Sequence, residues 1–383
     1  MRVAVINLTG GGMSGGYRKY LAEMLPRFAA HPGVSELLCA SSLALDGDGG
    51  HGKDSKVKFI RCSQFRMLHH RPDSKLAEAL DSFAPEVLFI PVERYVRYKK
   101  LPVVVMLQNM APLAGMKTGT GIKEWLRTAA RRFETRYALR YSTAVIVPTE
   151  FVKDFLSREV KIDPAKIYVV PYGNTAPAAQ PLAPYGVHKH TKFIFTAGSL
   201  EMYRGLEDLL FALPDIRSKF PEIKLAIAGG TRGPTRGYAA RLKSLAKGLG
   251  LEDAVVWLGN ISEPELSWAY FNCAAFVLTS RVESFCLIAL ESMAHGCNIV
   301  STKSACLPEI LADAATYYDA GDALSLSHAL MDLLSRDPAD TEKVRSTAMS
   351  RAAGFSWDET ASKTLNVLKN VFDGKVHSQP DRD

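Results

Sequence analysis

The chain of 383 residues lacks the features that mark membrane-spanning, disulfide-stabilised and zinc-binding proteins. No apolar run approaches the roughly 18 residues that a membrane span requires. The six cysteines form no C-x-x-C pair and have no histidine at ligand spacing, which argues against a disulfide framework or a zinc site. The opening segment Met1–Ile6 is short and typical of a first strand rather than a signal peptide. We therefore expect a cytoplasmic protein with reduced cysteines.

What is present is ordinary for a globular protein, with 47% hydrophobic and 23% charged residues. Short apolar runs alternate with amphipathic segments, which predicts α/β domains with mostly parallel sheets. The proline- and alanine-rich segment 174–190 shows no periodicity and predicts a stiff linker. We expect a first domain at 1–175, a linker at 176–190, a second domain at 191–355, and a final helix at 356–373 that packs on the first domain.

The segment 278–309 is the most informative part of the sequence. The end of an apolar strand is followed by a polar turn, and the spacing then predicts a helix over Phe285–His295. Glu283 precedes this helix and Glu291 lies inside it, so the two carboxylates are separated by about 10 Å along the axis. The free N–H groups at the helix start favour an anion. Together these groups could hold a sugar, a phosphate and a ribose in line.

This segment resembles the E-x7-E signature of retaining glycosyltransferases of the GT-B fold, family 4, commonly E-G-F-G-L-x-x-x-E-A-M-A-x-G. The matching string is Glu283-Ser-Phe-Cys-Leu-Ile-Ala-Leu-Glu291-Ser-Met-Ala-His-Gly296. Ser284 and Cys286 stand where the family commonly has glycines, so their side chains crowd the approach of the sugar. The alternative is a strand–helix unit with two ordinary surface glutamates.

The resemblance implies an α/β GT-B fold, with two Rossmann-like domains facing across a cleft and a C-terminal helix that crosses back to the first domain. It implies a retaining, metal-independent transferase that needs no cofactor and moves a hexose-type sugar from a UDP- or GDP-linked donor. The acceptor would be a glycan or lipid-linked glycan of a cell-surface polysaccharide (lipopolysaccharide, O-antigen or capsule). No Asp-x-Asp stands in the positions that would face the cleft, and we expect no metal site.

The same resemblance assigns the site residues of the second domain. Segment 198–205 is similar to the family element G-R-L-x-x-x-K-G, in which two basic residues clamp the donor diphosphate. Arg204 fills the second basic position and Ser199 replaces the first; a surface arginine that caps a turn is the alternative. Glu283 and Arg204 are the expected catalytic residues. The residues expected to bind the nucleotide sugar are Glu291, Ser284, Phe285, Cys286, Leu287, Gly198, Ser199, Gly229, Gly259, Asn260 and Ile261.

A glycine-rich loop follows the first strand, and Gly10, Gly12 and Gly15 fit the pattern G-x-G-x-x-G. A dinucleotide-binding protein would place an acid after the second strand, yet Ser41 and the serine after it stand there. This disfavours a dinucleotide-dependent oxidoreductase. By the family resemblance, Gly15 and Gly16 face the cleft near donor phosphate and acceptor, unless the glycines serve only a tight turn.

Gln108 and Asn109 follow another predicted strand of the first domain, where ligands bind beyond the carboxyl ends of parallel strands. Many family members place a His-Asp pair here. The two amides can bind a sugar hydroxyl, but they cannot act as acid or base at neutral pH.

The net charge of +7 is concentrated in segment 117–141, which holds seven Lys or Arg against two Glu, an excess of +5. No nucleic-acid-binding motif accompanies it. The apolar positions Leu126, Ala130, Phe133, Tyr137 and Tyr141 predict one stripe of a helix flanked by arginines. This helix either packs its stripe on the core or attaches to an anionic membrane at the inner face of the plasma membrane.

Three rivals remain open. A catalytically silent glycan-binding or scaffold protein could keep the fold, and Cys286 and the amides Gln108 and Asn109 are departures that fit it. A sugar phosphorylase and an inverting transferase of the same fold are the others. Turnover with a panel of nucleotide sugars separates them.

Overall fold

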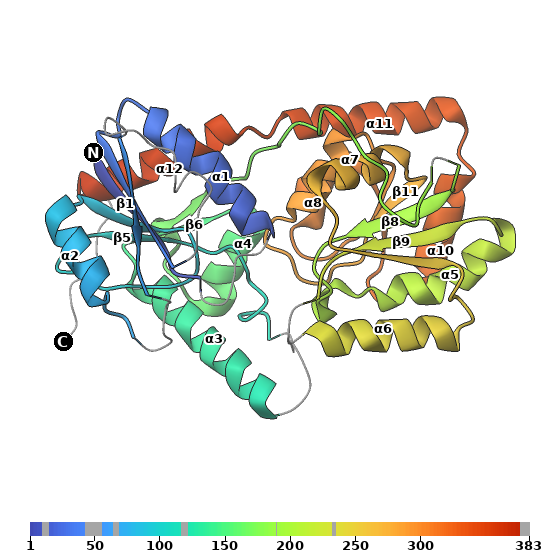
Figure 1. Ribbon diagram of the computed structural model, residues 1–383, viewed down its shortest axis with the longest axis horizontal. Coiled ribbons are helices and arrows are strands. Elements are labelled where there is room, and N and C mark those ends of the chain that lie inside the picture. Colours follow the sequence, from blue (N-terminus) through green and yellow to red (C-terminus); the bar gives the residue numbers. More distant parts are fainter. Residues whose placement is uncertain are drawn as a thin grey trace. The chain divides into compact units, whose positions relative to one another are not determined.

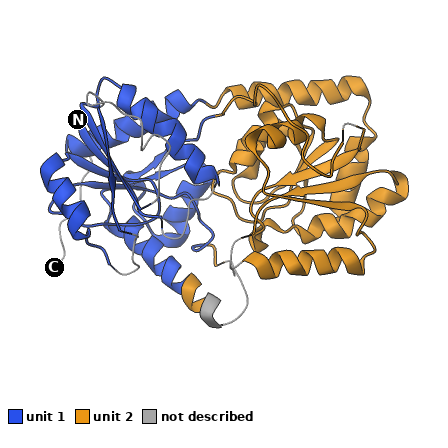
Figure 2. Ribbon diagram, viewed as in Figure 1, with its two compact units in different colours: residues 1–113, 129–173, 356–383 blue, residues 114–128, 174–355 orange. Residues whose placement is uncertain are grey.

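The computed structural model describes residues 1–9, 15–42, 56–63, 69–115, 122–188, 190–231 and 235–375. The chain forms two compact units, one with residues 1–113, 129–173 and 356–383, the other with 114–128 and 174–355 (Figure 2). Each unit has its own parallel β-sheet (Figure 1). The predicted α/β class with two Rossmann-like domains is confirmed.

The first unit is built on a sheet with strand order β3-β2-β1-β4-β5-β6-β7. The order reverses between β1 and β4, which both pair in parallel with their neighbours, and ligands of such sheets bind at this switch point. The strands are β1 (Arg2–Asn7), β2 (Glu36–Ser41), β3 (Val57–Arg61), β4 (Val87–Ile90), β5 (Val103–Met106), β6 (Ala144–Val147) and β7 (Ile167–Val169). The helices are α1 (Gly15–Ala30), α2 (Ser74–Phe83), α3 (Ile122–Tyr141), α4 (Glu150–Phe155), a π-helical turn (Leu156–Val160), a 3-10 turn (Pro164–Lys166) and α12 (Trp357–Phe372).

The last helix, α12, belongs to the first unit, where it lies beside α1 and also contacts β4 and β6 (Figure 1). Ser356 caps its N-terminus, and its buried face begins with Trp357. The Trp357 ring lies 6.1 Å from that of Tyr20 in α1 and 6.0 Å from that of Tyr172. An aromatic cluster therefore holds the end of the chain on the first sheet.

The second unit repeats the arrangement with strand order β10-β9-β8-β11-β12-β13, and its switch point lies between β8 and β11. Its strands are β8 (Phe193–Ala197), β9 (Lys224–Ala228), β10 (Val255–Gly259), β11 (Ala275–Leu278), β12 (Ile299–Thr302) and β13 (Ala315–Tyr318). Its helices are α5 (Glu207–Lys219), α6 (Arg236–Gly248), α7 (Glu263–Asn272), α8 (Leu287–Ala294), α9 (Leu307–Leu311), α10 (Ala323–Leu334) and α11 (Pro338–Ala353), with 3-10 turns at Met202–Arg204 and Ala312–Ala314.

The segment expected to be a linker packs on the second unit. The Leu182 N–H donates to the Pro264 carbonyl over 3.1 Å, and the Val187 side chain is buried. Residues 174–188 form no helix or strand, as the prolines favour.

The helix α3 does not pack its apolar stripe on the core. Leu126, Phe133 and Tyr141 are more than half exposed. The buried positions are Glu134, Thr135, Ala138 and Leu139. The prediction that the stripe faces the core is therefore wrong for the three exposed residues, whereas Tyr137 stacks on His70. The buried face includes Glu134, which lies 3.2 Å from the His70 imidazole. Among the described residues, no helix combines the length and apolar character that crossing a membrane requires.

Candidate functional site

The residues predicted to bind the donor gather at the switch point of the second sheet. The loop after β8 carries Gly198, Ser199 and Arg204, and the loop after β11 carries Glu283 and leads into α8. Parallel strands present their carboxyl ends at one edge, so these two loops are neighbours. The Arg281 N–H donates to the Tyr203 carbonyl over 2.8 Å, and the Thr279 hydroxyl donates to the Arg204 carbonyl.

The Arg204 guanidinium packs directly on the backbone of Gly198. A Cβ at Gly198 would lie 2.8 Å from Arg204 Cζ, and Gly198 has φ +119°, a conformation that L side chains rarely adopt. The positive φ therefore favours glycine here, and a larger residue would also displace the Arg204 guanidinium. Arg204 ends a 3-10 turn, and its guanidinium lies against Gly198, the residue that follows β8.

Arg204 and Glu283 form a buried ion pair. Arg204 Nη1 lies 3.4 Å from Glu283 Oε1, and the two side chains are 15% and 12% exposed. The Ser280 hydroxyl donates to the same Glu283 oxygen over 2.9 Å. Burial, the largest single influence, lowers the pKa of Arg204, but Glu283 together with Tyr203, Cys286 and Glu201 raises it, and the net pKa lies above its ordinary value. Arg204 Nε is buried and has no hydrogen-bond partner within the described part of the chain.

The start of α8 differs from the prediction. Cys286 adopts the left-handed conformation, with φ 74° and ψ 72°, and the helix begins at Leu287 rather than at Phe285. Residue 286 is one of the positions where the family commonly has glycine, and a left-handed residue cannot continue a right-handed helix. Ser284, Phe285 and Cys286 are all buried, and the Phe285 ring lies 5.8 Å from that of Phe355.

Glu291 lies inside α8, and its side chain is 9% exposed. The Tyr270 hydroxyl donates to Glu291 Oε2 over 3.3 Å. Burial, together with the Glu291 carboxylate, raises the pKa of Tyr270 well above its ordinary value, so the phenol stays protonated. Glu291 is thus held in a fixed position and is not an ordinary surface glutamate.

The ends of β8, β9 and β10 lie so close together that their backbones are in contact. A Cβ at Gly229, after β9, would lie 1.9 Å from the Gly198 carbonyl oxygen, and the Gly229 N–H donates to the Gly259 carbonyl over 2.7 Å. Gly259 and Asn260 are exposed, and Ile261 is half-buried. Gly198, Gly229 and Gly259 therefore line one edge of the sheet, as a backbone-dependent base site would require.

The pair of Arg281 and Asp208 was not anticipated from the sequence. Arg281 follows β11, and its guanidinium is bound by the buried Asp208 of α5 over 2.8 Å. Asp208 also accepts from the Tyr318 hydroxyl and from the Gly321 N–H. A Cβ at Gly205 would collide with Arg281, so a second arginine lies next to Arg204, while the exposed Ser199 contributes no charge. The presence of an arginine after β11 and an aspartate in α5 is the sequence pattern from which this ion pair could have been predicted.

In the first unit, the predicted residues Gln108 and Asn109 follow the carboxyl end of β5. Gln108 Nε2 donates to the Pro91 carbonyl over 2.8 Å, and Asn109 Oδ1 accepts from the Ala111 N–H. Both amides thus have structural contacts, and Asn109 is exposed. Gly15 and Gly16 are exposed first residues of α1. Gly10 and Gly12 lie outside the described residues.

The sequence reasoning also missed Glu93, which follows β4. Burial raises the pKa of Glu93, while Arg94 and the backbone N–H groups of Gln108 and Asn109 oppose that rise. At the end of β2, where a dinucleotide-binding sheet needs an acid, Ser41 accepts a hydrogen bond from Asn7 Nδ2 over 2.9 Å.

Within the described ranges, no three His, Cys, Asp or Glu side chains gather closely enough to hold a metal ion.

In chemical terms, the second unit presents two arginines, the first turn of a helix and two fixed carboxylates at one sheet edge. Arginine and free N–H groups match a diphosphate, and carboxylates match sugar or ribose hydroxyls. The arrangement suits a nucleotide diphosphate.

Comparison with known proteins gives relatives for both halves of the chain. The family described as Glycosyltransferase Family 4 matches residues 14–174, and Glycosyl transferases group 1 matches residues 183–350. The chain is 26% identical over 246 residues to the lipopolysaccharide 1,2-N-acetylglucosaminetransferase of Salmonella typhimurium, covering 60% of this chain and 62% of that protein. It is 30% identical over 203 residues to the D-inositol 3-phosphate glycosyltransferase of Arthrobacter sp., covering 51% and 47%. The alignments thus span less than two thirds of these relatives.

Among solved structures, Anabaena HepE in complex with UDP and glucose matches with a TM-score of 0.70 at 15% identity, over 97% of this chain and 100% of that one. This likeness concerns the fold. Because the two family matches follow one another along the chain, one on each Rossmann-like domain, the chain belongs to the family 4 glycosyltransferases with a group 1 domain, and its fold is GT-B.

Proposed function

We propose that this protein is a glycosyltransferase that moves a hexose-type sugar from a nucleotide diphosphate sugar to a glycan or lipid-linked acceptor. The observation that carries the proposal is the buried Arg204–Glu283 pair at the switch point of the second sheet. The guanidinium of this pair supplies the positive charge that stabilises a departing diphosphate. Family membership and the transferase names of the relatives support the same activity.

The donor is bound by the second unit. Arg204 and the N–H groups at the start of α8 contact the diphosphate, Glu291 holds the ribose, and the edge at Gly229 and Gly259 receives the base. The donor is UDP- or GDP-linked; the UDP in the HepE structure supports the former. The loop around Phe285, together with Ser284, Cys286 and Leu287, forms the wall beside the sugar.

The transfer retains the anomeric configuration and needs no metal. Glu283 Oε1 is already engaged by Ser280 and Arg204, which makes Glu283 a poor covalent nucleophile and favours a front-face reaction. The leaving diphosphate then helps to deprotonate the acceptor hydroxyl, while arginine charge takes the place that a metal would fill.

The acceptor belongs to cell-surface polysaccharide synthesis, such as lipopolysaccharide, O-antigen or capsule. The name of the Salmonella relative supports lipopolysaccharide. The exposed face of α3 supports attachment to an anionic membrane from the cytoplasmic side, because Trp125 and Phe133 are 66% and 53% exposed beside arginines. Gly15, Gly16, Gln108 and Asn109 would lie on the acceptor side.

A second candidate is a catalytically silent glycan-binding protein of the same fold. Cys286, which occupies a left-handed position better suited to glycine, is the specific observation in its favour. Such a protein would bind sugars or nucleotides without turnover.

Incubation with UDP- and GDP-sugars and a glycan or lipid-linked glycan acceptor tests both candidates, with release of the free nucleotide as the readout and EDTA in a parallel series. We expect turnover of one donor, unaffected by EDTA, and a product whose anomeric configuration by NMR equals that of the donor. Nucleotide binding without any turnover would favour the silent protein. Loss of activity in EDTA or an inverted product would overturn the corresponding part of the proposal.

A further inference from the structure

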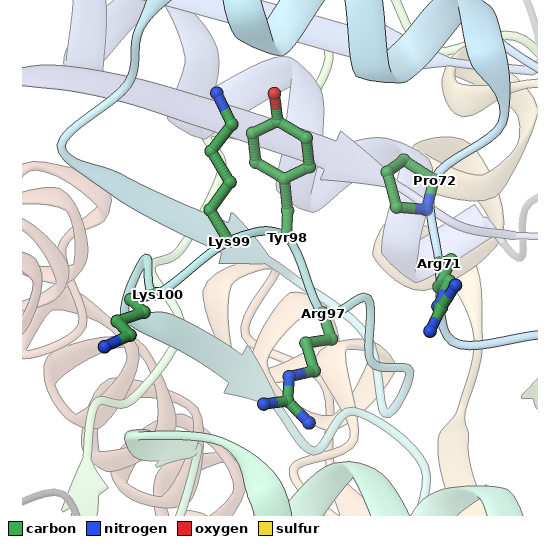
Figure 3. A pocket seen from close by; sticks show the side chains of 6 residues that line it. All are labelled: Arg71, Pro72, Arg97, Tyr98, Lys99 and Lys100. Carbon is green, nitrogen blue, oxygen red and sulfur yellow. The ribbon is translucent and has the colours of Figure 1, made fainter.

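A pocket in the first unit is lined mainly by cationic side chains. Its volume is about 570 Å³, and Figure 3 shows its lining residues Arg71, Pro72, Arg97, Tyr98, Lys99 and Lys100. Small-molecule sites commonly enclose roughly 300–1,000 Å³, so this hollow is large enough for a phosphorylated sugar or a headgroup. One wall follows β3 and the other follows β4.

The cations of the pocket are not equivalent. Lys99 Nζ and the Tyr98 hydroxyl both donate to Asp81 in α2, and Figure 3 shows the two side chains extending the same way. Lys99 is therefore neutralised. Arg71 and Arg97 extend the opposite way in the same view. Lys99 lies in a turn and has φ 51°, in the left-handed region.

Three cations remain without compensation. Arg71, Arg97 and Lys100 form no ion pair within the described ranges, and no carboxylate lines the pocket. Three like charges around one hollow repel one another, and an anion inside it relieves that repulsion. Guanidinium groups in particular match a phosphate through paired N–H donors.

The two walls are fixed before any ligand arrives. The Arg97 N–H donates to the His70 carbonyl over 2.7 Å, which joins the loops. The His70 ring stacks on Tyr137 of α3 at 3.8 Å between ring centroids. The Leu76 N–H donates to Asp73 over 2.7 Å, which caps α2 directly after the pocket. A rigid site loses less entropy when it binds.

We propose that this pocket binds the phosphate group of the acceptor, so that the substrate class is a phosphate-bearing glycan or glycolipid. The inference rests on the proposed transferase function and adds a specificity site to it. The same phosphate chemistry can come from a soluble phosphate ester or from a lipid headgroup. The connection of the pocket to α3 through His70 and Tyr137 would bring such a headgroup next to the helix with exposed arginines.

Titration of the full chain tests the soluble source. The pocket triple variant is Arg71→Ala/Arg97→Ala/Lys100→Ala, and the control triple variant Arg158→Ala/Lys363→Ala/Lys369→Ala removes three exposed cations elsewhere in the first unit. With sn-glycerol 3-phosphate as the probe, we expect the pocket variant to bind roughly tenfold or more weakly than wild type. The control variant should bind like wild type. Any glycerol phosphate that binds at the donor site contributes equally in all three proteins and does not affect the comparison.

Vesicle sedimentation tests the lipid source, with phosphatidic acid in phosphatidylcholine against phosphatidylcholine alone. Loss of phosphatidic acid binding in the pocket variant with unchanged glycerol phosphate binding identifies a headgroup, and the reverse identifies a soluble ester. Equal binding by wild type and pocket variant to both probes overturns the proposal. Neither measurement requires turnover, so failure of the transferase function would appear separately, as absent nucleotide-sugar turnover with pocket binding intact.

Discussion

The guanidinium of Arg204 lies 3.4 Å from the carboxylate of Glu283, with both side chains largely buried at the edge of the second sheet. The loop after β8 supplies the cation, and the loop after β11 supplies the anion. The guanidinium is already largely dehydrated, so its interaction with an incoming diphosphate does not require the loss of a hydration shell. This relationship makes Arg204 the residue whose removal is most informative.

Arg204→Ala is expected to lower kcat more than it raises KM, because charge on the diphosphate grows as the sugar bond breaks. Loss of one such stabilising group costs roughly 10²–10³ in kcat. Steady-state kinetics with the preferred donor measures both constants. Arg241→Ala, which removes an exposed arginine paired with Glu207, serves as control. A variant with unchanged kcat and only a raised KM would make Arg204 a simple binding residue.

Glu291→Gln is expected to weaken nucleotide binding by about tenfold to a hundredfold, since a charge-assisted hydrogen bond contributes roughly 1.5–3 kcal/mol. The side chain keeps its shape and its neighbour Tyr270, so the fold should be preserved. Calorimetric titration with UDP and GDP gives the affinities. Glu265→Gln, which changes the exposed capping box of α7, is the matched control. Unchanged affinity in Glu291→Gln would remove the ribose assignment.

Most of the fold follows from the local sequence pattern. The helix Ile122–Tyr141 contains the whole predicted stripe from Leu126 to Tyr141, and the Asp73 side chain caps the helix Ser74–Phe83 locally. The strand, turn and helix that carry Glu283 and Glu291 could likewise be predicted from the single segment 278–309.

Features that depend on distant partners could not be predicted. The burial of Glu134 in α3 requires His70, which lies 64 residues away. The Arg281–Asp208 pair joins residues 73 positions apart. The delayed start of α8 depends on the left-handed conformation of Cys286, which an L residue rarely adopts and a pattern of apolar positions does not reveal.

The conformation of Cys286 predicts an unusual order of stabilities. Glycine adopts φ 74° without strain, whereas alanine keeps a left-handed cost of about 1–2 kcal/mol. We therefore expect Cys286→Gly to be at least as stable as Cys286→Ala in urea unfolding. In α2, Ala77→Gly should instead lose about 1 kcal/mol, the ordinary helix result. Greater stability of Cys286→Ala would contradict the left-handed assignment.

Lys166 makes the stability of the first unit depend on pH. Its ammonium donates to the carbonyls of Arg140 and Ser142, and burial lowers its pKa to about 8, although Asp163 opposes that shift. The unfolded chain therefore binds more protons above pH 8, and the stability contributed by this site rises with pH up to about 10.4.

Urea unfolding of wild type and Lys166→Met between pH 7 and 10 measures this effect. The difference in unfolding free energy should move in favour of wild type as the pH rises. The exposed substitution Lys363→Met provides the baseline. A difference between wild type and Lys166→Met that does not change with pH would show that Lys166 titrates as an ordinary surface lysine.

The exposed face of α3 leads to the last prediction. Arg132, Arg136 and Arg140 are exposed on the same helix as Trp125 and Phe133. Each basic residue near an anionic membrane contributes about 1 kcal/mol, and the attraction fades within a Debye length. Aromatic side chains add interfacial affinity. Full-length wild type should therefore sediment with phosphatidylglycerol vesicles at low salt and dissociate as the salt concentration rises.

The variant Arg132→Glu/Arg136→Glu/Arg140→Glu should lose about 3 kcal/mol or more of this binding, roughly a hundredfold in affinity. Reversal of the same number of charges at Arg158, Lys363 and Lys369 separates the contribution of α3 from that of net charge. Equal losses in the two triple variants would mean that charge alone drives binding. Wild type that stays in the supernatant at low salt would leave α3 as a solvated helix, and a lipid-linked acceptor would then have to be recognised without help from the membrane surface.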